Sequence, residues 1–148
     1  MIDTHCHLYT KEFDPDIDLV IERAKMEGVT KFYMPAIDKS CTERMTVLEQ
    51  KFPQDCFSMA GLHPCSVNEN VEEELAHVKH LLQQRKFSAI GETGLDFYWD
   101  KTFTDLQYMA LEVQIELALQ YNLPLVLHTR NATQETINVI QKYSHTNL

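Results

Sequence analysis

Five short apolar runs along the chain alternate with segments in which apolar residues recur at helical spacing. The runs begin near positions 1, 29, 57, 87 and 123. Continuous apolar strands separated by amphipathic helices are typical of a parallel sheet covered by helices, because both faces of such a sheet are buried. The pattern therefore predicts an α/β fold in which residues 1–148 form five βα units of a single domain.

Local signals predict where individual helices begin and end. Asp14 and Pro15 are typical of a helix start, and Gly28 is typical of the end of that helix. Farther along, Thr104 and Gln107 stand at the spacing of a capping box, in which each side chain satisfies a backbone N–H at a helix start. We expect one helix between Pro15 and Gly28 and a longer one that begins at Thr104.

Two architectures are compatible with five βα units. One is a five-stranded doubly wound open sheet, and the other is a TIM-type (β/α)8 barrel, of which the chain contains only the first five units. A glycine-rich phosphate-binding loop after the first run, which would favour a nucleotide-binding open sheet, is absent from the sequence. The sequence therefore favours the barrel, with the open sheet as the alternative.

Residues that can bind a metal ion or move a proton stand at four of the five run ends. They are His5 and His7, His63, Glu92 and His128. In a parallel α/β fold the carboxyl ends of the strands lie on one side of the sheet, where active sites form. If the first run is a strand, Asp3, His5 and His7 share one face, so both imidazoles can reach the same ion.

The donor atoms of these residues suit divalent metal ions. Neutral imidazoles and a carboxylate form nitrogen and oxygen sites that zinc, manganese and magnesium can occupy. Glu92 has two carboxylate oxygens and could bridge a pair of ions about 3.5–4 Å apart, an arrangement that activates water in hydrolases. Hydrolysis is the reaction class that this donor set indicates, with Glu92 as the catalytic residue.

Two further residues could contact a substrate phosphate or have only structural roles. Arg130 shares the face of His128 on an extended strand, so its guanidinium could bind a phosphate oxygen or pair with a surface carboxylate. His63 could belong to the site or be hydrogen-bonded within a loop that Pro64 stiffens. The residues leave both alternatives open for Arg130 and favour a place at the site for His63.

The segment after Glu92 contains three more candidates. Asp96 could orient a ligand or cap the following turn, and its position does not decide between these roles. Tyr98 and Trp99 could stack on a nucleobase or cover the mouth of the site as a lid. We favour the lid for these two aromatic residues.

Composition and charge restrict the functions that this site can serve. The formal net charge of -9 argues against broad attraction to nucleic acid or anionic lipid, although bound divalent cations reverse the charge locally. No apolar run approaches the roughly 20 residues of a membrane span, and no signal peptide is recognisable, so we expect a cytoplasmic protein without a membrane partner. The four cysteines lack Cys-x-x-Cys spacing and are expected to be free thiols.

Four motifs in this order closely resemble the TatD family of metal-dependent deoxyribonucleases. They are His5-x-His7, Gly61-x-His63-Pro64, Gly91-Glu92-x-Gly94-Leu95-Asp96 and His128-x-Arg130. The resemblance implies a TIM-type barrel, two divalent ions (zinc, magnesium or manganese) and cleavage of phosphodiester bonds in DNA. By motif, it implies that His5 and His7 hold one ion, that Glu92 bridges, and that His128 helps to hold the second ion. It also implies that His63 and Arg130 lie near the substrate phosphate.

The chain departs from the family pattern in one residue and in length. Asn131 stands where the family more often has an aspartate, which affects the hydrogen bonding of that loop. Family members continue for roughly another hundred residues, as an eightfold barrel requires, and supply a further histidine and an aspartate to the site. We therefore expect this chain to be nearly inactive alone, and either to self-associate through the unpaired edges of the strands that begin at Met1 and Leu123 or to be only marginally stable. The alternatives are a related hydrolase of amide, lactone or phosphotriester bonds and a non-enzymatic domain.

Overall fold

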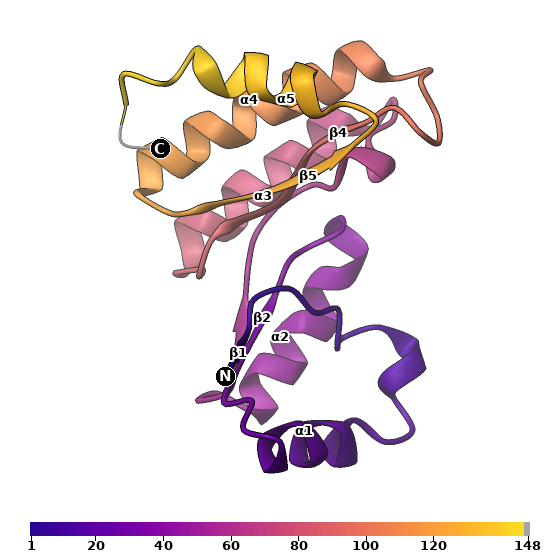
Figure 1. Ribbon diagram of the computed structural model, residues 1–148, viewed down its shortest axis with the longest axis vertical. Helices are drawn as coiled ribbons and strands as arrows, with labels where there is room; N and C mark the ends of the chain where they lie inside the picture. Colours follow the sequence, from indigo (N-terminus) through magenta and orange to yellow (C-terminus); the bar gives the residue numbers. More distant parts are fainter. Residues whose placement is uncertain (147–148) are drawn as a thin grey trace.

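Parallel strands form two sheets in residues 1–146, the part of the chain that the computed structural model describes (Figure 1). One sheet has the strand order β1 (Ile2–Asp3), β2 (Lys31–Met34) and β3 (Cys56–Ser58). The other sheet pairs β4 (Ile90–Asp96) with β5 (Leu125–Arg130). Strands that follow one another in the sequence are neighbours, and neither sheet in this described part contains the reversal of order found in a doubly wound sheet.

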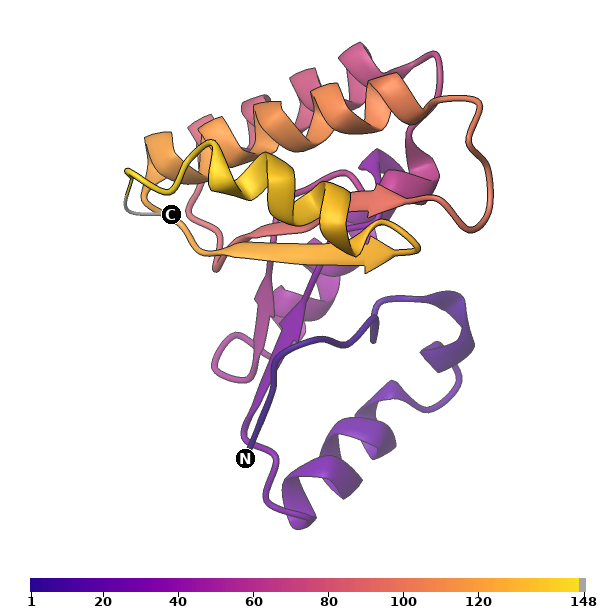
Figure 2. The same ribbon diagram turned by 45° about the horizontal axis from the view of Figure 1, so that its top comes forward.

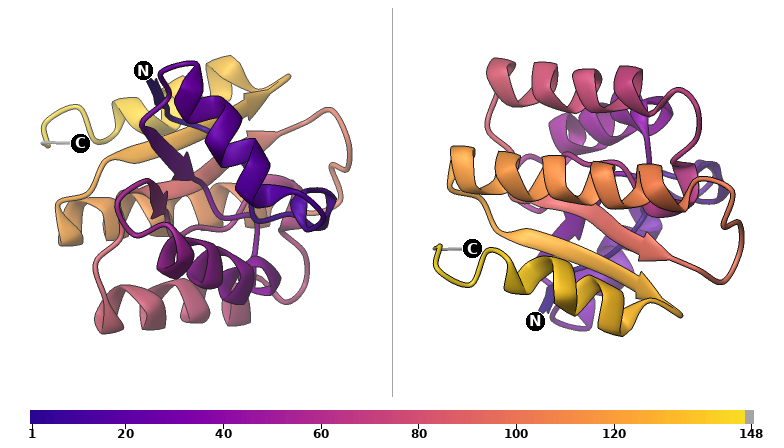
Figure 3. Two further views of the ribbon diagram at one scale, coloured as in Figure 1. Left: turned by 90° about the horizontal axis from the view of Figure 1, so that it is seen from below. Right: turned by 90° about the horizontal axis from the view of Figure 1, so that it is seen from above.

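Helices follow the strands and bury their apolar faces against them. They are α1 (Ile17–Met26), α2 (Thr42–Lys51), α3 (Val71–Gln84), α4 (Thr104–Tyr121) and α5 (Thr133–Gln141), with short 3-10 helices at Lys11–Phe13, Lys39–Cys41 and Pro64–Ser66. Figure 3 shows α4 and α5 packed along β4 and β5, with α3 on the other side of α4, and Figure 2 shows α1 at the opposite end of the molecule. Among the described residues, no helix combines the length and apolar character that crossing a bilayer demands.

The alternation of strands and helices agrees with the prediction, and α4 begins at Thr104 as predicted, whereas the predicted caps at Asp14 and Thr104 are wrong. The first helix begins at Ile17, because Asp14 closes the 3-10 turn before it and pairs with Arg44 of α2. At the start of α4, the Thr104 hydroxyl donates to the Lys101 carbonyl, and no side chain caps this helix. The predicted caps therefore fail for two reasons: the Asp14 side chain pairs with Arg44 of α2, and the Thr104 hydroxyl bonds to the nearby Lys101 carbonyl.

Two buried glutamines of α4 hold the backbone at the end of β4 and in the segment that follows β3. The Gln107 side chain accepts a hydrogen bond from Asp96 N at 2.9 Å and donates to the Asp96 carbonyl at 3.2 Å. The Gln114 side chain accepts from Leu62 N at 2.8 Å and donates to the Leu62 carbonyl at 3.2 Å. Since Leu62 immediately precedes His63, these bonds fix the backbone at two of the predicted site segments.

Replacing Gln114 with leucine is expected to lower the free energy of unfolding by about 2–4 kcal/mol, because it leaves two buried backbone groups of Leu62 without partners. Gln114 is fully buried, so water cannot replace the lost bonds. Urea denaturation followed by circular dichroism measures the change. The control is Gln120→Leu at an exposed position of the same helix, which is expected to change stability by less than about 0.5 kcal/mol. Equal effects of the two substitutions would contradict the structural role of Gln114.

The two sheets are joined where β4 begins. Gly91 N donates to the Ala60 carbonyl at 2.9 Å, Ala36 N donates to the Gly91 carbonyl at 2.9 Å, and Glu92 N donates to the Ala36 carbonyl at 3.1 Å. A Cβ atom at Gly61 would lie 2.6 Å from the carbonyl carbon of Gly91, so only glycine permits this close approach. The backbone of β4 therefore carries Glu92 to the junction of the two sheets.

Candidate metal centre

Four residues predicted as metal ligands come together from separate parts of the chain. Glu92 Oε2 lies 3.0 Å from His5 Nε2 and 3.9 Å from His7 Nε2. The other carboxylate oxygen, Glu92 Oε1, lies 3.2 Å from His128 Nδ1. The Glu92 side chain is only 8% exposed, whereas the His5 side chain is 41% exposed. The carboxylate is thus buried behind imidazoles, and the cluster opens to solvent on the side of His5.

The first two histidines reach Glu92 from beyond the end of β1. The strand ends at Asp3, whose carboxylate accepts a hydrogen bond from His5 N at 3.1 Å. The shared face of Asp3, His5 and His7 was expected only if the first run is a strand, and β1 ends before the histidines, where Asp3 bonds to the backbone. His5 and His7 still point the same way, with ring centroids 5.2 Å apart. Cys6 packs against the amino-terminal core, away from them, as expected.

Tyr9 determines which nitrogen of His7 carries the proton. Its hydroxyl donates to the Pro35 carbonyl at 2.7 Å and lies 2.7 Å from His7 Nδ1. Because the hydroxyl proton is already used, Nδ1 donates to Tyr9, and His7 Nε2 presents its lone pair towards Glu92. Burial and the neighbouring His5 lower the pKa of His7, which keeps the ring neutral. The sequence analysis missed Tyr9, although it continues the alternation of His5 and His7 by two residues.

Asp96 determines which nitrogen of His128 carries the proton, as Tyr9 does for His7. Burial alone would raise the pKa of Asp96, but hydrogen bonds from His128 and from the backbone N–H groups of Tyr98 and Trp99 hold it at about 2. Carboxylates face both ring nitrogens of His128, but the contact of Nε2 with Asp96 Oδ2 at 2.9 Å is shorter than that of Nδ1 with Glu92 Oε1 at 3.2 Å, so Nε2 carries the proton. His128 Nδ1 then presents its lone pair towards Glu92. Both roles that the sequence left open for Asp96 occur together: it orients a candidate ligand and caps the following turn.

His63 faces the same cluster with a hydrogen-bond donor instead of a lone pair. It precedes the 3-10 helix Pro64–Ser66, and its Nδ1 accepts a hydrogen bond from Cys65 N at 3.1 Å. The proton is therefore on Nε2, which lies 3.2 Å from His128 Nδ1 and 3.9 Å from Glu92 Oε2. Burial lowers the pKa of His63 to about 4, so the ring is neutral near pH 7. His63 thus offers the cluster a hydrogen-bond donor, whereas His7 and His128 offer lone pairs.

Arg130 ends β5 and stacks on aromatic residues of the loop between β4 and α4. Its guanidinium carbon lies 3.7 Å from the centroid of the Tyr98 ring and 5.2 Å from that of the Trp99 ring. Tyr98 is 50% exposed and Trp99 is 68% exposed. Together these three side chains form an exposed aromatic surface with a positive charge, and Asp96 connects its loop to His128.

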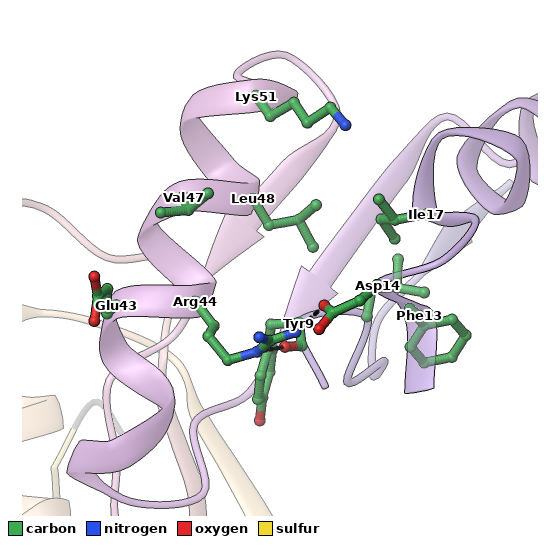
Figure 4. Close-up of a pocket in the computed structure, with 10 residues that line it drawn as sticks. Tyr9, Phe13, Asp14, Ile17, Glu43, Arg44, Val47, Leu48 and Lys51 are labelled. Carbon is green, nitrogen blue, oxygen red and sulfur yellow. Dashed lines mark hydrogen bonds and ion pairs between the residues drawn. The ribbon is translucent and has the colours of Figure 1, made fainter. Parts of the chain in front are cut away.

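A groove of about 440 Å³ lies between the loop after β1 and helix α2 (Figure 4). Its walls include Phe13 and Ile17 on one side and Val47 and Leu48 on the other. Tyr9 lines the groove and also hydrogen-bonds within the cluster around Glu92. Among the described residues that line this groove, none is a predicted metal ligand, so the predicted chemistry lies elsewhere.

The donor set around Glu92 fits a divalent metal ion. One ligand atom from each of His5, His7 and Glu92 lies within 4.8 Å of the others. The hydrogen bonds of Tyr9 and Asp96 direct imidazole lone pairs towards the buried carboxylate, as partners of metal-binding histidines commonly do. The fold and the cluster define a class of protein: a parallel α/β protein whose strand ends carry an imidazole and carboxylate site suited to divalent ions.

The chain belongs to the family described as TatD related DNase, whose family model matches residues 2–148. This finding confirms the family that the four sequence motifs indicated. A Bacillus subtilis (strain 168) protein described as the uncharacterized metal-dependent hydrolase YabD is 36% identical over 143 residues, which are 96% of this chain and 55% of that protein.

Other relatives carry nuclease names or have solved structures. An Erwinia tasmaniensis protein described as the 3'-5' ssDNA/RNA exonuclease TatD is 31% identical over 143 residues, which are 97% of this chain and 55% of that protein. The crystal structure of YjjV, a TatD homolog from Escherichia coli K12, matches with a TM-score of 0.89 at 30% identity and covers 97% of this chain and 56% of that one. This chain spans about half the length of the curated relatives it matches.

Replacing Asp96 with alanine is expected to lower the affinity of the chain for Mn²⁺ about tenfold to a hundredfold. The substitution removes the hydrogen bond that fixes the ring orientation of His128 and the nitrogen that carries its proton. Isothermal titration calorimetry measures this affinity. Asp100→Ala is the matched control, since Asp100 is exposed in the same loop and caps only Thr102 N. If both substitutions lower the affinity equally, loop structure and not His128 orientation is responsible.

Proposed function

We propose that this chain contains the first five βα units of a TIM-type barrel whose active site hydrolyses phosphodiester bonds in DNA with two divalent ions. The observation that carries the proposal is the position of Glu92: one oxygen faces His5 and His7, and the other faces His128. A carboxylate with imidazoles on both oxygens suits the bridging of two ions, which is the arrangement of many phosphodiester hydrolases. Membership of the TatD related DNase family supports this reaction class.

The candidate ligands divide into two groups in this proposal. His5 Nε2, His7 Nε2 and Glu92 Oε2 would hold one ion, and Glu92 Oε1 and His128 Nδ1 would hold the second. When bound, such ions activate water and neutralise the charge that develops on the phosphate. The nitrogen and oxygen donors suit zinc or manganese, and magnesium where more oxygens join them. Tyr9 acts as a positioning residue, because it fixes the proton of His7.

His63 and Arg130 are assigned to the substrate phosphate. His63 Nε2 carries a proton and lies within the cluster, so it can donate to a phosphate oxygen without competing for an ion. Arg130 adds a planar fork of donors at the end of β5, which suits two oxygens of one phosphate. Local donors of this kind are needed because the net charge of -9 repels a polyanion.

Tyr98 and Trp99 are assigned to a nucleobase next to the cleaved bond. Bases stack on aromatic side chains when they are free of a duplex, so these exposed rings favour a single-stranded end. Stacking is preferred to the lid expected from the sequence, because Arg130 already packs against the Tyr98 ring. The name of the Erwinia relative, an exonuclease of single-stranded DNA and RNA, supports this assignment.

Completion of the barrel requires strands that pair with β1 and β5. These are outer strands of the two described sheets, so further βα units would extend the fold along them. The curated relatives contain many residues beyond the matched part, and we assign to such residues the further histidine and aspartate of the site. Without these units, the free strand edges are expected to cause self-association of the chain.

The proposed function is tested by comparing this chain with a chimera completed by the carboxyl-terminal part of Escherichia coli YjjV, whose structure matches it. With Mn²⁺ and a labelled single-stranded oligonucleotide, the chimera is expected to release nucleotides, and the chain alone is expected to be nearly inactive. Lactone, amide and phosphotriester substrates are assayed in parallel. Faster hydrolysis of one of these would favour a related hydrolase, and equal rates for chain and chimera would contradict the incomplete site. Failure of both proteins to bind metal would favour a non-enzymatic domain.

A further inference from the structure

His128 stands between two carboxylates and can present a lone pair to either side. Nδ1 lies 3.2 Å from Glu92 Oε1, and Nε2 lies 2.9 Å from Asp96 Oδ2. A neutral imidazole carries one proton, so it donates to one carboxylate and offers its lone pair beside the other. Because both tautomers have a hydrogen-bond partner, an ion that binds on either side can select the tautomer that suits it.

A second donor set lies on the Asp96 side of the ring. Asp96 Oδ2 lies 3.3 Å from Cys65 Sγ and 2.9 Å from His128 Nε2. Cys65 and His128 also have ligand atoms within 4.8 Å of each other, in a group that includes His63. Cys65 is exposed, so an ion can reach it from solvent. A thiolate with imidazole and carboxylate donors selects zinc over magnesium and manganese, which prefer oxygen ligands. Of Cys65, Asp96 and His128, only His128 is also a ligand in the proposed hydrolytic centre.

We propose that Cys65, Asp96 and His128 form a zinc site that competes with the hydrolytic centre for His128. When zinc binds, the thiol proton of Cys65 leaves to solvent, and zinc takes the lone pair of His128 Nε2. The imidazole proton is then on Nδ1, which donates a hydrogen bond to Glu92 Oε1. His128 can no longer hold an ion beside Glu92, so zinc at this set inhibits an enzyme that works with manganese or magnesium.

Cobalt(II) is the probe for this site, because it replaces zinc and gives a near-ultraviolet charge-transfer band when a thiolate binds it. Titration of the 148-residue chain is expected to produce this band at one cobalt per chain, and Cys65→Ser is expected to lack it. The matched control, Cys6→Ser, is expected to keep the band, since Cys6 Sγ faces the Tyr33 carbonyl at 3.5 Å. Absence of the band in the unaltered chain, or its persistence in Cys65→Ser, would overturn the zinc site.

The competition for His128 is measured separately, by electron paramagnetic resonance of Mn²⁺ with and without one equivalent of zinc. This part depends on the proposed function, because it assumes that Mn²⁺ binds beside Glu92. Zinc is expected to weaken Mn²⁺ binding at least about tenfold more in the unaltered chain than in Cys65→Ser. Equal weakening in both proteins would overturn the competition. No Mn²⁺ binding in either protein would overturn the proposed function instead, while the cobalt band would still support the zinc site.

Discussion

Replacing Glu92 with alanine is expected to lower the affinity of the chain for Mn²⁺ by at least about a hundredfold, more than loss of any positioning residue. Glu92 is the residue that faces both imidazole groups, with His5 at 3.0 Å and His128 at 3.2 Å from its two oxygens. Its removal leaves neutral imidazoles without the negative charge that attracts a divalent ion. Calorimetry measures the affinity, and hydrolysis of the oligonucleotide by the completed chimera is expected to disappear.

The control for this prediction separates charge from shape. Glu92→Gln keeps the size of the side chain and one acceptor oxygen, so it is expected to fold normally while binding metal almost as weakly as the alanine variant. Glu116→Ala changes an exposed glutamate of α4 and is expected to leave both affinity and hydrolysis unchanged. A loss of less than about tenfold in Glu92→Ala would contradict the bridging role.

Replacing Gly94 with alanine is expected to lower the free energy of unfolding by about 3 kcal/mol or more. Gly94 pairs with His128 between β4 and β5, and an added Cβ would lie 2.9 Å from the carbonyl carbon of His128 and closer still to its oxygen. The strands must separate to accept it, which moves His128 away from Glu92. Urea denaturation measures the stability, and the affinity for Mn²⁺ is expected to fall with it.

Gly28→Ala is the matched control for this substitution. Gly28 also has a positive φ, +87° against +148° at Gly94, but a Cβ there would meet no atom within 4 Å. The backbone strain alone is expected to cost roughly 1–2 kcal/mol. The difference between the two variants therefore measures the contact with β5. If Gly28→Ala were as destabilising as Gly94→Ala, close strand packing would not explain the glycine at position 94.

The class of fold was predictable from the sequence because it depends on a repeated pattern. Apolar runs at a regular period and helices between them indicate parallel α/β units, and five such units are present in the described residues. The side chains that cap the helices were not predictable. Asp14 and Gln107 have local preferences for helix caps, but Arg44 and the Asp96 backbone bind them more favourably in the folded chain.

The candidate site was predictable to a similar degree. Its members stand at the carboxyl ends of apolar runs, and a parallel topology brings such positions together whatever the loops do. The sequence therefore identified His5, His7, Glu92 and His128 as neighbours before any distance was known. It did not identify Tyr9, which follows the alternation of His5 and His7, and it did not show that the first strand ends at Asp3, before the histidines.

By itself, the sequence determined the fold class and the kind of ligand atoms at the site. The periodic pattern sets the layers of strands and helices, and the residue types at the run ends set the donor atoms. Only the tertiary structure decided which nitrogen of each imidazole carries a proton. That choice depends on hydrogen bonds shorter than about 3 Å between residues far apart in the chain, such as Asp96 with His128 and Tyr9 with Pro35. Contacts of this kind follow from packing and have no signature in local spacing, so the position of Cys65 beside Asp96 became visible only in three dimensions.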